Sequence, residues 1–223
     1  GLQKKVNDIE MRKNGVLSIV WPEFFALSCE KEEYATFSGQ NPGIEISVME
    51  ESEEMGIHLL REGLADVAFM YAPISKDLES HVIVEREPLC AVIKRENPLA
   101  EKENIDIEDL VGHVLIFSSG NNITRKNIIK KAKETAGEEL ELIPISYTQM
   151  LHAVYTKDCI ALAPENAFRY INFPELVYKP VKFKEQDFYE LECHLVTVKR
   201  ENYKAEIERY IAYEKESCKR RFL

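Results

Sequence analysis

The chain has 223 residues, of which 45% are hydrophobic and 30% are charged, a balance that is ordinary for a globular protein with a packed core. Its 39 acidic and 29 basic residues give a net charge of −10, which disfavours binding to the phosphate backbone of nucleic acids. No segment approaches the roughly 18 apolar residues of a membrane span, and residues 1–15 are too polar for a secretory signal. We therefore expect a cytoplasmic protein without a membrane contact.

The cysteines and histidines are too scattered for a metal centre or a disulfide framework. Five of each occur, and no Cys-x-x-Cys or His-Glu-x-x-His spacing joins any of them. There is also no Ser-His-Asp order, paired carboxylates or Cys-His arrangement of the kind that enzymes use. The sequence predicts reduced thiols, no metal and no cofactor, and it ranks catalysis last among the possible functions.

Strand and helix patterns alternate in the first part of the chain. Residues 16–20 form a β-branched run that predicts a strand, and the following Trp21-Pro22-Glu23 suits the first turn of a helix. An apolar side continues this helix to about Gly39, and the alternation over residues 44–48 predicts a second strand.

The next segments extend the same pattern. Ser52 begins a near capping motif for a helix that ends close to Gly63. Residues 66–71 are almost continuously apolar, which is typical of a strand that is buried on both faces of a parallel sheet. The resulting order of strand, helix, strand, helix, strand predicts an α/β domain.

A second set of units follows a polar, turn-rich stretch at residues 94–104, where we expect a boundary. The strands expected around and after this stretch are 88–93, 114–117, 140–145, 159–163 and 191–198, and the helices are 124–136, 148–156 and 203–214.

The stretch from Leu115 to Asn127 passes from an apolar run, through small polar residues around Gly120, into a helix. It lacks both Gly-Lys-Ser/Thr and three spaced glycines, so it is not a nucleotide-binding loop. Two interpretations remain open for its polar residues. They either present a helix N-terminus to an anion or a carbonyl oxygen, or they merely cap the helix.

Five short motifs, taken in order, resemble the effector-binding (co-inducer) domain of the LysR-type bacterial transcriptional regulators from about residue 14 onward. They are Gly15-x-Leu17-x-Ile19, Phe37 with Pro42-x-Ile44-x-Ile46, Leu60-x-x-Gly63-x-x-Asp66-Val67-Ala68, Glu87-Pro88-Leu89 with Asn97-Pro98-Leu99-Ala100, and Ile107-x-Asp109-Leu110. The sequence departs from the family pattern at Val20, Lys157 and Cys159, where glycines are usual, and at Asn97, where histidine is usual.

The resemblance implies an α/β fold of the two-lobed type 2 periplasmic-binding-protein kind, in which each lobe is a mostly parallel sheet flanked by helices and the chain crosses twice between lobes. Residues 1–13 would be a lead or linker remnant. Lobe I would comprise residues 14–93 and 194–223, and lobe II residues 94–193.

In such folds the ligand lies between the lobes, beyond the carboxyl ends of the parallel strands. Structural roles stay open for several candidates, because Trp21, Tyr71 and Tyr147 also suit a core or a hinge and Thr148 also suits a helix cap. The candidate ligand-binding residues are Trp21, Pro22, Glu23, Tyr71, Ser118, Ser119, Gly120, Asn121, Tyr147, Thr148 and Ile160.

The resemblance implies a domain that senses a small-molecule effector and relays its binding to an N-terminal helix-turn-helix domain. No helix-turn-helix pattern precedes Gly15, so DNA contact is expected only through a domain outside this chain. A free-standing solute-binding protein of an uptake system is the alternative that the same fold permits, and an enzyme ranks below both.

Charge also suggests how two copies would pair. The helix Glu23–Phe37 is acidic, whereas the helix Thr124–Ala136 is basic. In LysR-type dimers, corresponding helices of the two lobes meet around a two-fold axis, so we expect a homodimer through these two helices. Apolar residues are expected to supply most of the affinity, namely Phe24, Leu27, Ile128 and Ile129.

Overall fold

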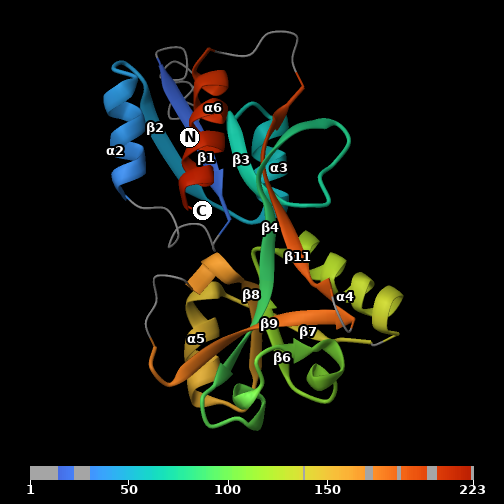
Figure 1. Ribbon diagram of the computed structural model, residues 1–223. Coiled ribbons are helices and arrows are strands. Elements are labelled where there is room, and N and C mark those ends of the chain that lie inside the picture. Colours follow the sequence, from blue (N-terminus) through green and yellow to red (C-terminus); the bar gives the residue numbers. More distant parts are fainter. Residues whose placement is uncertain are drawn as a thin grey trace, which may run out of the picture.

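The computed structural model describes residues 15–22, 31–137, 139–168, 173–184, 187–199 and 205–221. Figure 1 shows two α/β lobes, one above the other, with the long strand β4 running through the junction between them. We keep the names lobe I for the part with β1, β2 and β3 and lobe II for the part with β6, β7 and β8. Among the described residues, no helix combines the length and the apolar character that crossing a membrane requires.

Lobe I is built on a sheet of order β2-β1-β3-β11-β4. Strands β1, β2 and β3 are parallel, as predicted, whereas β11 runs antiparallel to both β3 and β4. Its strands are β1 (Val16–Trp21), β2 (Glu45–Glu50), β3 (Val67–Tyr71), the first part of β4 (Leu78–Lys94) and β11 (Glu190–Val198). Its helices are α2 (Lys31–Gln40), α3 (Glu53–Arg61) and α6 (Ala205–Arg221).

Lobe II continues from the second part of β4 through β8 and β6 to β7, with β9 on the other side of β4. Strand β6 is parallel to β7 and β8, and α4 and α5 flank these strands on opposite sides (Figure 1). The strands are β5 (Ile105–Asp106), β6 (Leu115–Ser118), β7 (Leu142–Ile145), β8 (Ile160–Pro164), β9 (Leu176–Lys184) and β10 (Asp187–Phe188). The helices are α4 (Asn122–Ala136) and α5 (Tyr147–Thr156), with 3-10 turns η2 (Pro98–Glu101), η3 (Ile107–Leu110) and η4 (Glu165–Phe168).

The chain passes between the lobes inside continuous strands. In β4, Pro88 pairs with β11 of lobe I, and the next residue, Leu89, pairs with β8 of lobe II. Cys193 of β11 pairs with Tyr71 in the sheet of lobe I. The boundaries expected after residues 93 and 193 therefore fall inside strands, and we propose that the crossovers lie within β4 and β11.

Local sequence patterns located most of the elements but not the strands that are half exposed. Most expected elements appear within a few residues of their predicted ends, although α6 continues to Arg221 beyond its predicted end at residue 214. Residues 78–87 of β4, the whole of β9 and the short strands β5 and β10 were not predicted. Acidic residues interrupt the first segment and lysines interrupt the second, because both strands leave one side open to solvent. The start of the helix expected from Glu23 lies outside the described residues.

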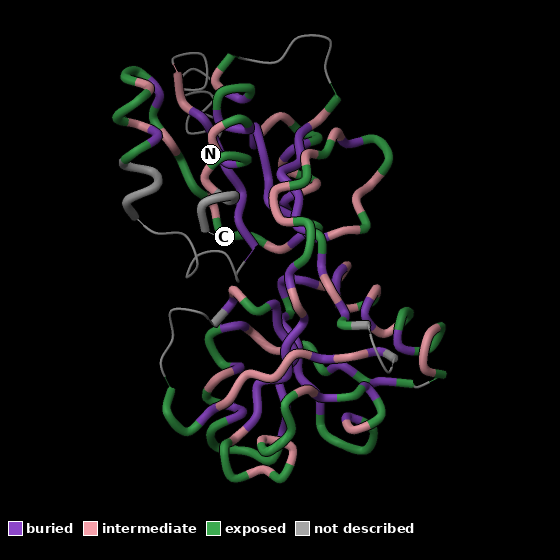
Figure 2. The backbone as a smooth tube through the Cα atoms, viewed as in Figure 1, coloured by how far each residue is buried: buried purple, intermediate pink, exposed green. Residues whose placement is uncertain are grey.

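The buried side chains form one large core along the central strands of both lobes and a smaller one beneath α3 (Figure 2). Val20, which replaces a glycine of the family pattern, belongs to the smaller core and is 2% exposed. A Cβ atom on Gly56 of α3 would lie 3.3 Å from Val20 Cγ1 and 3.2 Å from Met70 Cε. Gly56 thus leaves the space that the larger Val20 side chain fills.

Candidate functional site: the junction between the lobes

Helix α3 of lobe I begins directly against the first turn of α4 in lobe II. The Ser52 hydroxyl caps α3 by accepting a hydrogen bond from the Met55 N–H, at 3.2 Å. This cap places Glu53 at the first helical position, where its N–H donates to the Gly120 carbonyl of lobe II, at 2.8 Å. The turn between β6 and α4 is therefore bonded to lobe I through the backbone.

The Glu53 carboxylate enters the N-terminus of α4. It accepts hydrogen bonds from the N–H groups of Ile123, at 2.8 Å, and Thr124, at 3.0 Å. The Thr124 hydroxyl donates a third bond to the same carboxylate. Beside it, the Asn122 side-chain amide donates to Glu54, at 2.7 Å. A helix N-terminus favours an anion, and in this chain the anion is a carboxylate from the other lobe.

Burial makes the charge of Glu53 sensitive to pH near neutrality. The side chain is 3% exposed, and this burial raises its pKa to about 7, although the hydrogen bonds from Thr124 and Ile123 act in the opposite direction. The contact therefore changes between a neutral and an ionised form close to neutral pH.

A second buried carboxyl group joins the lobes at the crossover in β4. Glu87 accepts hydrogen bonds from the Tyr71 hydroxyl, at 3.0 Å, and from the Asn166 N–H, at 3.1 Å. Tyr71 ends β3 in lobe I, whereas Asn166 lies in η4 of lobe II. Burial raises the pKa of Glu87 to about 7 against these two hydrogen bonds. It also raises the pKa of Tyr71 well above its ordinary value, and the Glu87 charge adds to that shift.

The structure places most of the sequence-predicted site residues where strands end or helices begin. Trp21 and Pro22 end β1 and are buried, and Tyr147 begins α5 with its hydroxyl donating to the Ala167 carbonyl. Exposed Thr148 follows, with its hydroxyl 3.4 Å from that of Ser146.

One of the predicted residues does not join this group in the structure. Ile160 pairs with Leu115 at the amino end of the lobe II strands, so it lies away from the other candidates. Glu23 lies outside the described residues.

The N–H groups of residues 119–121 are already bonded within the protein. The Ser119 N–H donates to the Ile145 carbonyl, at 2.9 Å, and the Gly120 N–H donates to the Ser118 hydroxyl, at 3.2 Å. The Asn121 N–H donates to the Ser118 carbonyl, at 3.3 Å. These amides are bonded to β7 and within their own turn, and only Ser119 in this stretch is exposed.

Simple capping by Asn121 is not observed either. Asn121 occupies the N-cap position of α4, but its side chain makes no capping hydrogen bond. The side chain is 0% exposed, and among the described residues neither its oxygen nor its nitrogen has a hydrogen-bond partner. A buried amide without partners costs about 1–3 kcal/mol, so Asn121 is the group in this turn that would gain most from a polar ligand.

Sequence reasoning missed Glu53, Glu87 and Asn166. An acidic residue in the first turn of a helix is an ordinary feature, and Glu87 was noted only as part of a family motif. Glu53 meets Thr124 across 71 positions of sequence and Glu87 meets Asn166 across 79, so no local pattern could have paired them.

Comparisons with known proteins agree with this two-lobed architecture. Residues 12–219 match the LysR substrate binding domain family, and the chain therefore belongs to that family. It is an effector-binding domain of the kind that LysR-type transcriptional regulators contain. No curated protein matches the sequence.

Several solved structures share the fold. The effector binding domain of QuiR in complex with shikimate is 16% identical, with a TM-score of 0.77 over 94% of this chain and 100% of that one. The BenM effector binding domain with its effector benzoate is 15% identical, with a TM-score of 0.75 over 93% of each chain. Full-length CbnR complexed with its target DNA is 16% identical, with a TM-score of 0.74 over 98% of this chain and 77% of that one.

The raised pKa of Glu53 predicts a specific dependence of stability on pH. Its folded pKa of about 7 lies above the ordinary value of 4.5, so its contribution to the unfolding free energy is fully present below pH 4.5 and is lost as the pH rises through 7. The unfolding free energy of wild type should decrease between pH 5 and pH 8. In Glu53→Gln, measured by urea unfolding, this decrease should be roughly half as large, because Glu87 titrates in the same range. The matched control is Glu54→Gln, which should retain most of the decrease, because the Glu54 charge is a minor cause of the raised Glu53 pKa. An unaltered pH profile in Glu53→Gln would show that this carboxyl group does not titrate there.

The hydrogen bond from Tyr71 to Glu87 makes a separate prediction. Tyr71→Phe removes one donor from a buried carboxyl group, which should lower the unfolding free energy by about 1–3 kcal/mol. The loss should grow as the pH rises past 7, because the missing bond favours the ionised form. Tyr155→Phe is the control, since that side chain is 53% exposed. Equal effects of the two substitutions, measured by urea unfolding at pH 6 and pH 8, would contradict the role given to this bond.

Proposed function

We propose that the chain is a sensor that binds a small metabolite between its lobes and relays binding to a DNA-binding domain of the same regulator. The observation that carries the proposal is Asn121, in the turn where lobe II meets lobe I: its side-chain amide is fully buried and has no hydrogen-bond partner in the part of the chain that the structure describes. A ligand that supplies the missing hydrogen bonds would offset the free-energy cost of burying this amide. Family membership supports the same function.

The proposed site combines groups from both lobes. Lobe I contributes the strand ends at Trp21-Pro22 and Tyr71, and lobe II contributes Asn121 together with the exposed hydroxyls of Ser119 and Thr148. Burial raises the pKa of Tyr147, and the charges of Tyr178 and of Glu50 at the end of β2 in lobe I add to the shift. Tyr147 of lobe II thus lies within electrostatic reach of Glu50 of lobe I.

The occupied N-terminus of α4 restricts the chemistry of the effector. Because Glu53 already takes the N–H groups of Ile123 and Thr124, a carboxylate ligand would have to displace it or would meet its charge. A ligand that offers hydroxyl or amide groups meets neither obstacle. We therefore infer that the effector presents neutral hydrogen-bonding groups to this turn.

Membership of this family supports a ligand-binding sensor of a regulator over a solute-binding protein of an uptake system, and it supports binding over catalysis. Full-length CbnR has been solved with its target DNA, and this chain covers 77% of that protein. We propose that a comparable DNA-binding part acts with this domain in the cytoplasm. The net charge of −10 gives the domain itself little affinity for DNA.

Asn121→Ala should separate ligand binding from stability. Replacing an unpartnered buried amide should leave the unfolding free energy within about 1 kcal/mol of wild type or raise it, whereas it should weaken effector binding about three- to tenfold through the lost hydrogen bonds. A panel of polar metabolites would be screened by thermal shift, and hits would be titrated by the fluorescence of Trp21, the sole tryptophan.

Asn97→Ala is the matched control, because Asn97 caps η2 away from the junction and accepts from the Leu99 N–H, at 2.9 Å. It should bind the effector as wild type does. The proposal fails if an effector binds Asn121→Ala and the double variant Ser119→Ala with Thr148→Ala as tightly as it binds wild type.

We also propose a homodimer through the acidic segment 23–37, of which the structure describes residues 31–37 in α2, and the basic α4. The structure changes the expected energetics of this dimer. Ile128 is 0% exposed in the core of lobe II and Ile129 is half-buried, so the expectation that these two residues supply affinity is wrong for Ile128. The outer face of α4 presents Lys126 and Lys130. Phe24 and Leu27 lie outside the described residues.

A dimer that uses this face of α4 should depend strongly on charge. Lys126→Glu combined with Lys130→Glu should weaken the dimer in sedimentation experiments, and so should raising the salt concentration from 50 to about 500 mM, because salt screens exposed charges. Lys157→Glu, an exposed lysine beyond α5, should have no effect. A dimer that is insensitive to the α4 substitutions and to salt would place the interface elsewhere.

A further inference from the structure

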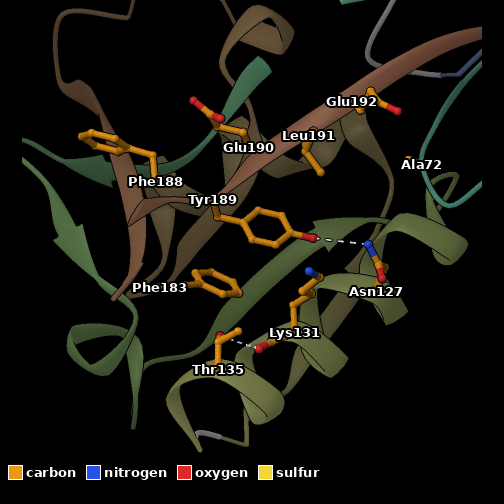
Figure 3. A pocket seen from close by; sticks show the side chains of 10 residues that line it. All are labelled: Ala72, Asn127, Lys131, Thr135, Phe183, Phe188, Tyr189, Glu190, Leu191 and Glu192. Carbon is orange, nitrogen blue, oxygen red and sulfur yellow. Dashed lines mark hydrogen bonds between the residues drawn. The ribbon is translucent and has the colours of Figure 1, made fainter. Parts of the chain in front are cut away.

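A cavity of about 460 Å³ lies on the α4 side of lobe II, away from the strand ends that form the proposed effector site. Figure 3 shows its lining: one turn after another of α4 on one side, the segment around Tyr189 on the other, and Ala72 of lobe I at the far end. Its volume is in the range that small-molecule sites occupy. None of the residues proposed to hold the effector lines it.

The apolar wall of the cavity is built from two stacked rings. Phe183 of β9 and Tyr189 have centroids 4.4 Å apart and planes inclined by 25°, and the two side chains are 5% and 8% exposed. The Asn127 amide of α4 donates to the Tyr189 hydroxyl, at 3.4 Å. Leu191, 2% exposed, continues the wall. A rigid aromatic surface of this kind favours a flat, apolar ligand.

The charged side chains of the lining are one lysine, Lys131, and two carboxylates, Glu190 and Glu192. Each carboxylate has a neighbour outside the cavity, since Arg86 binds Glu190, at 2.6 Å, and His194 Nε2 lies 2.5 Å from Glu192. Lys131, in contrast, forms no ion pair with any carboxylate of the described residues, although it also lines the cavity. Figure 3 shows its amino group beside the Tyr189 ring.

Neighbouring lysines of α4 differ from Lys131 in this respect. Lys130 lies 3.7 Å from Glu134, and Lys133 pairs with Glu139. Neither of these two lysines lines the cavity. The cavity therefore combines a stacked aromatic wall with a lysine that has no carboxylate partner among the described residues, and an anionic aromatic ligand would contact both.

We propose that this cavity is a second ligand site, for a small aromatic carboxylate. The ring lies against Phe183 and Tyr189, and the carboxylate accepts from the Lys131 ammonium and the Asn127 amide. This site is separate from the proposed effector site. It also requires different chemistry, because the N-terminus of α4 beside the proposed effector site already holds the Glu53 carboxylate. A ligand here contacts α4 directly, two turns from the end that Glu53 holds.

Phenylacetate and its neutral analogue phenylacetamide test the proposal on the whole chain. Nuclear magnetic resonance titration should show phenylacetate shifting the signals of Asn127, Lys131 and Tyr189, with phenylacetamide binding at least about tenfold more weakly because it lacks the charge-assisted bond. Lys131→Gln should reduce phenylacetate affinity by a similar factor and leave phenylacetamide unchanged. Lys130→Gln, the matched control one residue away, should leave both ligands unchanged.

The outcomes distinguish this site from the one between the lobes. Asn121→Ala should not alter phenylacetate affinity, so the test of the second site is independent of the test of the proposed function. The proposal is overturned if phenylacetate does not bind at 20 mM, on the order of the weakest binding such titrations detect. It is also overturned if Lys131→Gln binds phenylacetate as wild type does, or if the shifted signals belong to Trp21 and Thr148 instead of Tyr189.

Discussion

The contact between the Glu53 carboxylate and the first turn of α4 determines how the two lobes lie together. Helix α4 starts without a capping side chain of its own, and its free N–H groups are satisfied only when lobe I is in place. Separating the lobes would expose both the helix end and the carboxylate to water, and a few hydrogen bonds compensate for the burial of that charge. The lobes are therefore held by a polar contact whose strength depends on its protonation.

Glu87 is also a buried carboxyl group that accepts hydrogen bonds from both lobes, at the point where β4 passes from one sheet to the next. Two carboxyl groups with pKa values of about 7 thus join the lobes. An effector at the proposed site would lie near both contacts, and binding that changed their solvation would change the relative energies of different lobe arrangements. This is the kind of differential interaction through which a ligand shifts a conformational equilibrium.

Local rules of sequence predicted the order of strands and helices, the Ser52 cap and the parallel sheet, because these depend on neighbouring residues. They did not predict β9 or the first part of β4, whose exposed faces give no continuous apolar pattern. The chemistry of the junction was also beyond local reasoning. Ser118 and Asn121 were correctly placed at a helix start, but the donors around them are used within the turn and by Glu53, and only the fold brings Glu53 there.

A double-mutant cycle between Glu53 and Thr124 tests most directly whether this contact joins the lobes. Unfolding free energies would be measured in urea at pH 8 for wild type, Glu53→Ala, Thr124→Val and the double variant. The account predicts a coupling energy of at least about 1 kcal/mol, because the Thr124 hydroxyl bonds the carboxylate in a buried site. Additive effects, with a coupling energy within about 0.3 kcal/mol of zero, would contradict it.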